Sequence, residues 1–195
     1  MHQTSAASDR RYVLADTLPT FAVRDAVLVV GFAALVGLLA QLVIVLPFTP
    51  VPITGQTFGV LLGGMALGWR RAVAGMAVYV GLGLVGVHWF AGGNGGAAII
   101  GAPSFGYLVG FVVAAAVLGR LAELRFDRNP FGVLGSMVVG NLIIYLFGVS
   151  WLIVAIHVDV AQGIALGLTP FLLGDAIKAF LAAGLLPTAW KVSGR

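Results

Sequence analysis

The longest uncharged stretch of this chain runs from residue 72 to residue 119 and holds 48 residues without an Asp, Glu, Lys or Arg. A transmembrane helix needs about 20 consecutive, mostly apolar residues, so two spans fit into this stretch. The whole sequence has the same character, because 60% of its 195 residues are hydrophobic and only 9% are charged, against roughly 25% charged in an average soluble domain. The sequence therefore predicts an all-α integral membrane protein that forms one helical bundle.

Breaks rich in proline, glycine or charge divide the chain into six apolar segments. Three prolines end the first segment, a glycine cluster divides the long uncharged stretch, and a charged loop precedes the fifth segment. The predicted transmembrane helices cover residues 26–46, 58–69, 72–87, 105–118, 131–156 and 170–190, with a short loop that begins at residue 157. The second helix has only 12 residues, so we expect the proline-rich loop before it to dip into the membrane.

Basic residues predict the orientation of the six spans. Cytoplasmic loops are enriched in Lys and Arg, and ten of the eleven basic residues fall on one side if both termini are cytoplasmic. The exception is Lys178. Residues 1–25 then form a cytoplasmic tail, with room for a short interfacial helix, and residues 26–191 form the transmembrane domain. The formal charge of +4 indicates contact of basic loops with anionic membrane lipid rather than binding of nucleic acid.

Asp175 and Lys178 stand inside the last apolar segment. A charge at the centre of a bilayer costs roughly 2.5–3.5 kcal/mol, so charged residues within a span mark a functional site by default. Their i, i+3 spacing places both side chains on one face of a helix. The same spacing also fits a structural ion pair in which the two charges neutralise each other. The residues alone leave both interpretations open.

Two uncharged loops, residues 47–57 and 88–104, share the predicted outer end of the bundle with this charged pair. We therefore expect the loops and the pair to meet at a small-molecule site. Amide side chains, aromatic rings and glycine backbone, which permits close approach, would line it. The candidate residues are Gln56, Phe90, Gly93, Asn94, Tyr107, Asp175 and Lys178, and Trp89 is a further aromatic candidate. By itself, the glycine cluster also fits a simple flexible turn.

Known catalytic and nucleotide-binding motifs are missing from the sequence. It contains neither the His-Glu-x-x-His of metalloproteases nor the Gly-x-Ser-x-Gly of hydrolases, and no Gly-Lys-Ser/Thr phosphate loop. There is no cysteine, and His88 and His157 have no second ligand at metal spacing. We expect a binding or transport protein that is not an enzyme and has no cofactor or metal. Pumping driven by ATP would need a separate ATPase chain.

Several motifs follow one another along the chain. They are VPITGQTF at residues 51–58, LLGG at 61–64, LGWRR at 67–71, FAGGNGG at 90–96, GYLVGF at 106–111 and PFLLGDAIK at 170–178. In this order and spacing they resemble the BioY family, the biotin-specific substrate-binding (S) components of energy-coupling-factor (ECF) transporters of prokaryotes. The resemblance covers about residues 26–190 and is specific because several motifs keep a consistent order and spacing.

The resemblance implies a six-helix S-component fold in the cell membrane of a prokaryote, with high-affinity capture of biotin from outside. It implies that Asn94, Asp175 and Lys178 contact biotin, with Gln56 and Tyr107 nearby. It also implies two kinds of partner, a transmembrane coupling subunit and a pair of ATPase subunits, with which the S component works to release biotin inward.

Two alternatives to this function remain at the level of sequence. The fold could serve another vitamin, or the chain could be a structural or channel-like protein with an internal ion pair. Small residues of the first helix have two possible uses as well. Ala33 and Gly37 correspond to the face that S components offer to the coupling subunit, but small residues equally permit close helix packing within one chain.

Overall fold

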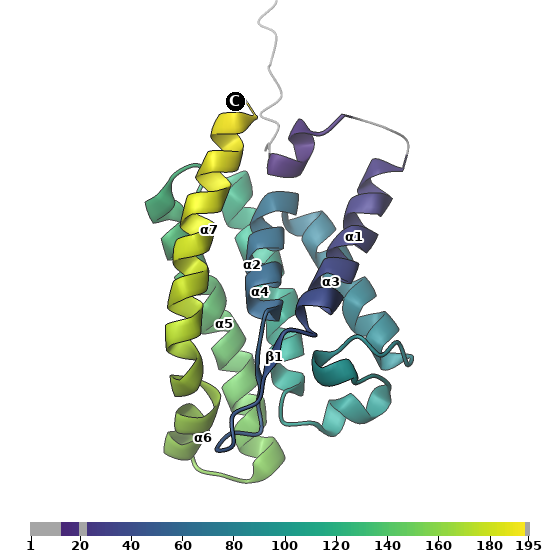
Figure 1. The fold of residues 1–195 in the computed structure, drawn as a ribbon, viewed down its shortest axis with the longest axis vertical. Coiled ribbons are helices and arrows are strands. Elements are labelled where there is room, and N and C mark those ends of the chain that lie inside the picture. Colours follow the sequence, from purple (N-terminus) through teal and green to yellow (C-terminus); the bar gives the residue numbers. More distant parts are fainter. Residues whose placement is uncertain (1–12, 20–22, 194–195) are drawn as a thin grey trace, which may run out of the picture.

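The computed structural model describes residues 13–19 and 23–193, and helices make up most of this part of the chain (Figure 1). The α-helices are α1 (Arg24–Leu39), α2 (Gln56–Leu67), α3 (Trp69–Leu84), α4 (Phe105–Glu123), α5 (Pro130–Ile156), α6 (Val160–Gly167) and α7 (Leu172–Val192). Short 3-10 helices lie at Leu14–Thr17, Ala91–Gly93, Ala97–Gly101 and Thr169–Phe171, and strands β1 (Val43–Ile44) and β2 (Ile53–Thr54) form an antiparallel pair.

The six predicted helices are present as α1 to α5 and α7, and α6 is an additional short helix. The prediction of a plain loop from residue 157 to the last helix was wrong. Asp159 is the N-cap of α6, and its Oδ1 accepts a hydrogen bond of 2.8 Å from the backbone N–H of Gln162. This is the usual way in which a helix start is stabilised. The chain from Val160 to Val192 is one apolar, mostly helical segment.

Helix length divides the described part of the chain into two groups. Three segments, α4, α5 and Val160–Val192, are long and apolar enough to cross a membrane. The others are shorter, with 16 residues in α1, 12 in α2 and 16 in α3. Sixteen residues extend about 24 Å at the α-helical rise, less than the roughly 30 Å of a hydrocarbon core. Irregular segments extend the bundle beyond the last residue of α1 and the first residue of α2. Figure 1 shows the β1–β2 hairpin at this end of the bundle.

The first helix ends at Leu39, seven residues before the predicted end at residue 46. Other parts of the chain satisfy the last carbonyl groups of α1. The backbone N–H of Gly55 donates to the carbonyl of Leu39 at 3.1 Å, and Nε2 of Gln41 donates to the carbonyl of Gly37 at 3.0 Å. Residues 43 and 44 then pair with β2. A short apolar run does not reveal by its pattern whether it forms helix or buried extended chain.

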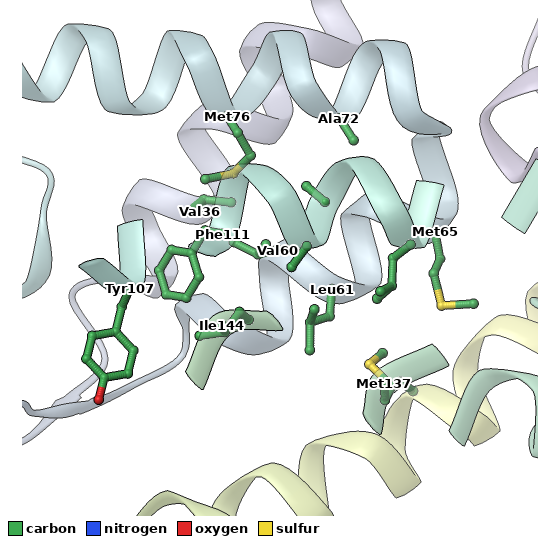
Figure 2. Packing of buried hydrophobic residues seen from close by; sticks show 14 of the residues in the cluster. Val36, Val60, Leu61, Met65, Ala72, Met76, Tyr107, Phe111, Met137 and Ile144 are labelled. Atoms are coloured by element: carbon green, nitrogen blue, oxygen red, sulfur yellow. The ribbon is translucent and has the colours of Figure 1, made fainter. Parts of the chain in front are cut away.

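The core lies within the bundle of α1 to α5, in which α4 packs against α5, α2 and α3. Figure 2 shows buried side chains from these five helices, with Tyr107 at one edge of the cluster and Met137 near the other. Gly110 permits the close approach of α4 to α5, because a Cβ there would lie 3.0 Å from the Cα of Ile144. The core therefore fixes α4 relative to α5, and these two helices carry five of the residues that line the cavity described below.

Ala33 and Gly37 are buried within this chain. Ala33 has no exposed surface, and a Cβ on Gly37 would lie 3.1 Å from the ring of Trp89. The small residues of α1 thus make room for α3 and for the loop that follows it. Of the two uses that the sequence leaves open, the structure shows packing inside the chain.

The basic residues of the described chain gather at one end of the bundle, apart from Lys178. They lie at the start of α1, at the start of α3, around the α4–α5 loop and at the end of α7, namely Arg24, Arg70, Arg71, Arg120, Arg125, Arg128 and Lys191. The 3-10 helix Leu14–Thr17 packs at this same end, where Asp16 binds Arg71 at 2.8 Å. The rest of the predicted tail, residues 1–12 and 20–22, lies outside the described residues.

Candidate functional site

A cavity of about 370 Å³ opens at the end of the bundle opposite the basic residues. Pockets that bind small molecules measure about 300–1,000 Å³. Both uncharged loops line it, as predicted, together with α2, α4, α5 and α7. The lining residues are Pro50, Val51, Pro52, Thr54, Gln56, Thr57, Phe90, Ala91, Asn94, Gly95, Ala98, Ile99, Ala102, Pro103, Ser104, Tyr107, Leu108, Phe111, Ile144, Tyr145, Phe171, Asp175 and Lys178.

Six of the seven predicted site residues line this cavity. They are Gln56, Phe90, Asn94, Tyr107, Asp175 and Lys178. The seventh, Gly93, lies in an exposed turn at a φ of 72° and does not line the cavity, whereas Gly95 does. The geometry of that turn explains the difference. Gly93 has the left-handed backbone conformation that glycine adopts without strain, so its place in the motif is accounted for by the turn itself.

The carboxylate of Asp175 is held by donors from three helices. Its side chain is 7% exposed. Oδ2 accepts a hydrogen bond from the hydroxyl of Tyr145 at 2.5 Å, while Oδ1 lies 3.1 Å from Nζ of Lys178 and 3.5 Å from Oγ1 of Thr57. Buried carboxylates need such partners, because an unpaired charge in a low-dielectric interior is costly. The carboxylate therefore has a fixed orientation at the wall of the cavity.

The ammonium of Lys178 is equally well placed. Nζ donates to the carbonyl of Thr54 at 3.0 Å, to Oγ1 of Thr57 at 2.6 Å and to Asp175. These three acceptors match the three donors of an ammonium group. Thr54 is the last residue of β2 and Thr57 lies in the first turn of α2, so Lys178 joins α7 to the place where the proline-rich loop enters α2. A bound carboxylate could replace one of these acceptors and gain a charge-assisted hydrogen bond.

Phe90 forms an aromatic part of the cavity lining, and Gln56 of α2 is hydrogen-bonded to the neighbouring Tyr79 of α3. Nε2 of Gln56 donates to the hydroxyl of Tyr79 at 2.7 Å, and this hydroxyl lies 3.3 Å from the carbonyl of Trp89. The ring of Phe90 meets the ring of Tyr79 edge to face, with centroids 5.3 Å apart. Phe90 itself fills the space left by the missing side chain of Gly83. Trp89, a further aromatic candidate from the sequence, packs behind the wall and does not line the cavity.

Two hydrogen bonds connect the proline-rich loop and α4 to the α6–α7 junction. Tyr107 donates to the carbonyl of Gly167 at 2.6 Å, and Oγ1 of Thr49 donates to the carbonyl of Leu166 at 2.8 Å. Tyr107 also lies against the ring of Phe171. Because the junction leads directly into the first turn of α7, these contacts position the segment that carries Asp175.

Tyr145 and Thr57 also belong to the site, although the sequence did not predict them. Tyr145 is a polar side chain within the apolar segment 131–156. The principle that drew attention to Asp175, that polar groups inside a span are costly and therefore functional, also applies to this hydroxyl. Thr57 gives no comparable signal, since a threonine next to a proline-rich loop is common in turns.

Metal binding has no support from the described residues, in which no three His, Cys, Asp or Glu side chains come together. The fold and the cavity define a multi-pass helical membrane protein with a small-molecule cavity at one end of its bundle and basic residues at the other. The chain belongs to the BioY family, whose sequence profile matches residues 8–195.

Comparison with individual proteins agrees with this membership. A Rhizobium etli protein described as biotin transporter BioY is 36% identical over 168 residues, covering 82% of this chain and 89% of the relative. A Thermotoga maritima protein with the same description is 39% identical over 152 residues, covering 75% and 88%. A crystal structure described as the S-component for biotin from an ECF-type ABC transporter matches with a TM-score of 0.80 at 26% identity, over 89% of this chain and 95% of that one. The predicted S-component fold is confirmed.

Proposed function

We propose that this chain binds biotin in the cavity described above and serves in biotin uptake as the S component of an ECF transporter. The observation that carries this proposal is the pairing of Asp175 with Lys178 at the wall of a cavity of about 370 Å³ that aromatic and aliphatic side chains also line. Membership of the BioY family supports the choice of ligand. The proposed activity is binding and transport, without a catalytic step.

The chemistry of biotin suits this lining. Its ureido ring has hydrogen-bond donors and acceptors, which the amide of Asn94 and the carboxylate of Asp175 can match. Its thioether ring is apolar and suits a wall such as Phe90 and Phe111. Its carboxylate suits a cationic partner, and Lys178 is the one basic residue among the described residues that lines the cavity. We therefore propose Asn94, Asp175 and Lys178 as direct contacts, with Gln56, Phe90 and Tyr107 supporting the walls.

The distribution of charge supports an orientation in the membrane. Cytoplasmic loops of membrane proteins carry the excess of Lys and Arg. We therefore assign the basic end of the bundle, with both termini, to the cytoplasm of a prokaryote and the cavity to the outer face. Inward release of biotin then needs a reorientation of the chain in the membrane. This chain has no nucleotide-binding motif with which it could use ATP to drive that movement. A transmembrane coupling subunit and ATPase subunits are the proposed partners.

Binding of radiolabelled biotin to the purified chain in detergent tests the proposal. We expect saturable binding, competed by unlabelled biotin but not by thiamine, riboflavin or other vitamins. The Lys178→Ala variant should lose affinity for biotin far more than for biotinamide, which lacks the carboxylate. The Lys191→Gln variant, which removes a basic residue at the opposite end, is the matched control. Competition by a different vitamin with biotin inactive would show that the fold serves another ligand.

One observation also favours a purely structural role for the charged pair. Asp175 and Lys178 contact each other within one helical turn, and each also has further partners from the chain. A pair that only neutralises its own charges predicts a protein that biotin does not stabilise. A rise in melting temperature with biotin concentration, the expected result for a ligand that binds the folded state, would eliminate this alternative.

A further inference from the structure

An open groove lies at the basic end of the bundle, the end opposite the cavity. Trp69 and Arg70 at the start of α3, and Ala116, Val117 and Arg120 near the end of α4, line it. Gly119 creates this arrangement, because a Cβ there would collide with the backbone N of Trp69. The start of α3 thus packs directly on α4 and places two arginines at one surface site.

The two arginines differ in how their charges are compensated. Arg120 binds Glu123 with an N–O distance of 2.6 Å, and its side chain is still 49% exposed. Arg70 has no carboxylate within ion-pair distance among the described residues. Its guanidinium lies 5.5 Å from the centroid of the Trp69 ring instead. A guanidinium has five N–H donors arranged for phosphate and carboxylate groups, so the groove offers uncompensated positive charge and unused donors.

Apolar surface continues from this groove toward the middle of the bundle. Ala116 and Val117 form its floor, and Val113 and Val109 follow on the same face of α4 at spacings of four residues. Val109 is 38% exposed. Trp69 is also exposed, and tryptophan is enriched where membrane protein surfaces meet the headgroups of lipids. A ligand of this groove would thus have an anionic head and a long apolar tail.

We infer that this groove is a binding site for one anionic glycerophospholipid of the cytoplasmic leaflet. The phosphodiester accepts hydrogen bonds from Arg70 and Arg120, Trp69 lies at the headgroup level, and an acyl chain follows Val113 and Val109. Basic pockets between transmembrane helices on the cytoplasmic side are suited to such headgroups. The combination of a phosphate-binding pair with an apolar stripe favours lipid over a soluble anion, which would leave the stripe without a role.

Native mass spectrometry of the full chain tests this site. The protein is released from micelles that contain equal amounts of phosphatidylglycerol and phosphatidylcholine with the same acyl chains. We expect the wild type to retain phosphatidylglycerol several-fold over phosphatidylcholine. Arg70→Gln and, separately, Arg120→Gln should reduce that ratio toward one, while Arg70→Lys should keep part of it. Lys191→Gln, which removes one positive charge from α7 at the same end, should leave the ratio unchanged.

Two controls and one contrary outcome make the experiment decisive. Retained biotin binding in Arg70→Gln shows that the variant folds, because the cavity lies at the other end of the bundle. Thermal stabilisation by phosphatidylglycerol but not by an equal concentration of inorganic phosphate supports a lipid site, and equal stabilisation by phosphate overturns it. The inference also fails if wild type and Arg70→Gln retain the two lipids in the same ratio. If Arg70→Gln leaves this ratio unchanged and lowers co-purification of a membrane coupling protein, the groove binds that protein and the lipid site is wrong.

Discussion

The hydroxyl of Tyr145 on α5 donates a hydrogen bond of 2.5 Å to Oδ2 of Asp175 on α7. The other carboxylate oxygen, Oδ1, faces Lys178 and Thr57. Each oxygen therefore has its own donors, and they come from α2, α5 and α7. The charged pair is part of a network between helices rather than an isolated contact within one turn, and the geometry of the cavity depends on how these helices pack.

Replacement of Tyr145 by phenylalanine should weaken biotin binding. It removes a hydrogen bond to a charged acceptor, which contributes about 1.5–3 kcal/mol, and it leaves the carboxylate of Asp175 free to turn. We expect a loss of affinity of about 10- to 100-fold in a radiolabel binding assay, with the helical bundle intact by circular dichroism.

A matched control is available on the same helix. Ser136 is buried on α5 and donates its hydroxyl hydrogen to the carbonyl of Gly132 at 2.8 Å, away from the cavity. The Ser136→Ala variant should lower stability slightly and leave biotin affinity unchanged. An equal loss of affinity in Ser136→Ala and Tyr145→Phe would mean that general loosening of α5, not the position of Asp175, controls binding.

A double-mutant cycle separates the ligand-binding role of Asp175 and Lys178 from their mutual neutralisation. Asp175→Asn or Lys178→Met alone leaves one buried charge without its partner. This should cost about 3 kcal/mol of stability, the lower end of the range for a buried pair, because the Lys178 side chain is 20% exposed. The double variant should recover part of this stability, measured by thermal melting, and still fail to bind biotin. Wild-type affinity in the double variant would show that the pair is purely structural.

The long apolar helices were predictable from their composition and length. The conformation of the irregular segments was not. For α5, a continuous apolar run begins at Asn129-Pro130, a cap and first-turn combination, so both the helix and its start are evident from sequence. The segment from residue 40 to residue 46 is also largely apolar, but it turns at residues 40 and 41 and is extended at Val43–Ile44. Its conformation depends on contacts with residues distant in sequence. The backbone N–H of Gly55 donates to the carbonyl of Leu39 at the end of α1, and the side chain of Gln41 donates to the carbonyl of Phe90.

Site residues were predictable where a side chain has a high free-energy cost in its sequence context. Asp175 and Lys178 carry charges within an apolar segment, and this identifies them as candidates. Gly93 has no such cost, because a glycine in a motif serves either a ligand or the backbone conformation, and only the observed φ of 72° distinguishes the two. The sequence also predicted Gln56 as a site residue without indicating its hydrogen-bond partner. Its amide nitrogen bonds to Tyr79, a contact between α2 and α3 that no local pattern specifies.

Replacement of Gly83 by alanine should damage the aromatic wall of the cavity. A Cβ at this position would collide with the ring of Phe90, which is only 1% exposed and lines the cavity. Overpacking of this kind costs about 1–3 kcal/mol. We expect a lower melting temperature and biotin affinity reduced roughly tenfold, since 1.4 kcal/mol corresponds to a factor of ten.

Gly81 on the same helix provides the control. A Cβ there would meet nothing within 4 Å. Alanine in a helix is more favourable than glycine by about 0.5–1 kcal/mol, so Gly81→Ala should melt at the same or a slightly higher temperature and bind biotin as the wild type does. The explanation through Phe90 is wrong if the two variants change affinity to the same extent.

Stability of the basic end should decrease as pH rises, because of Asp127 in the α4–α5 loop. Burial raises the pKa of this fully buried carboxyl above its ordinary value of 3.8, and the hydrogen bond from Trp190 and the charge of Arg128 offset only part of this effect. In the folded state Asp127 therefore keeps its proton to a higher pH than in the unfolded state. Its contribution to stability is full below a pH of about 3.8 and is lost as pH rises through the folded pKa.

Asp127→Asn keeps an acceptor for Trp190 and cannot ionise, so its melting temperature should fall less than that of the wild type from pH 4 to 7. Asp159→Asn, the same change at an exposed helix cap, should follow the wild-type profile. Parallel pH profiles for wild type and Asp127→Asn would show that this carboxyl does not control the stability of the α4–α5 loop.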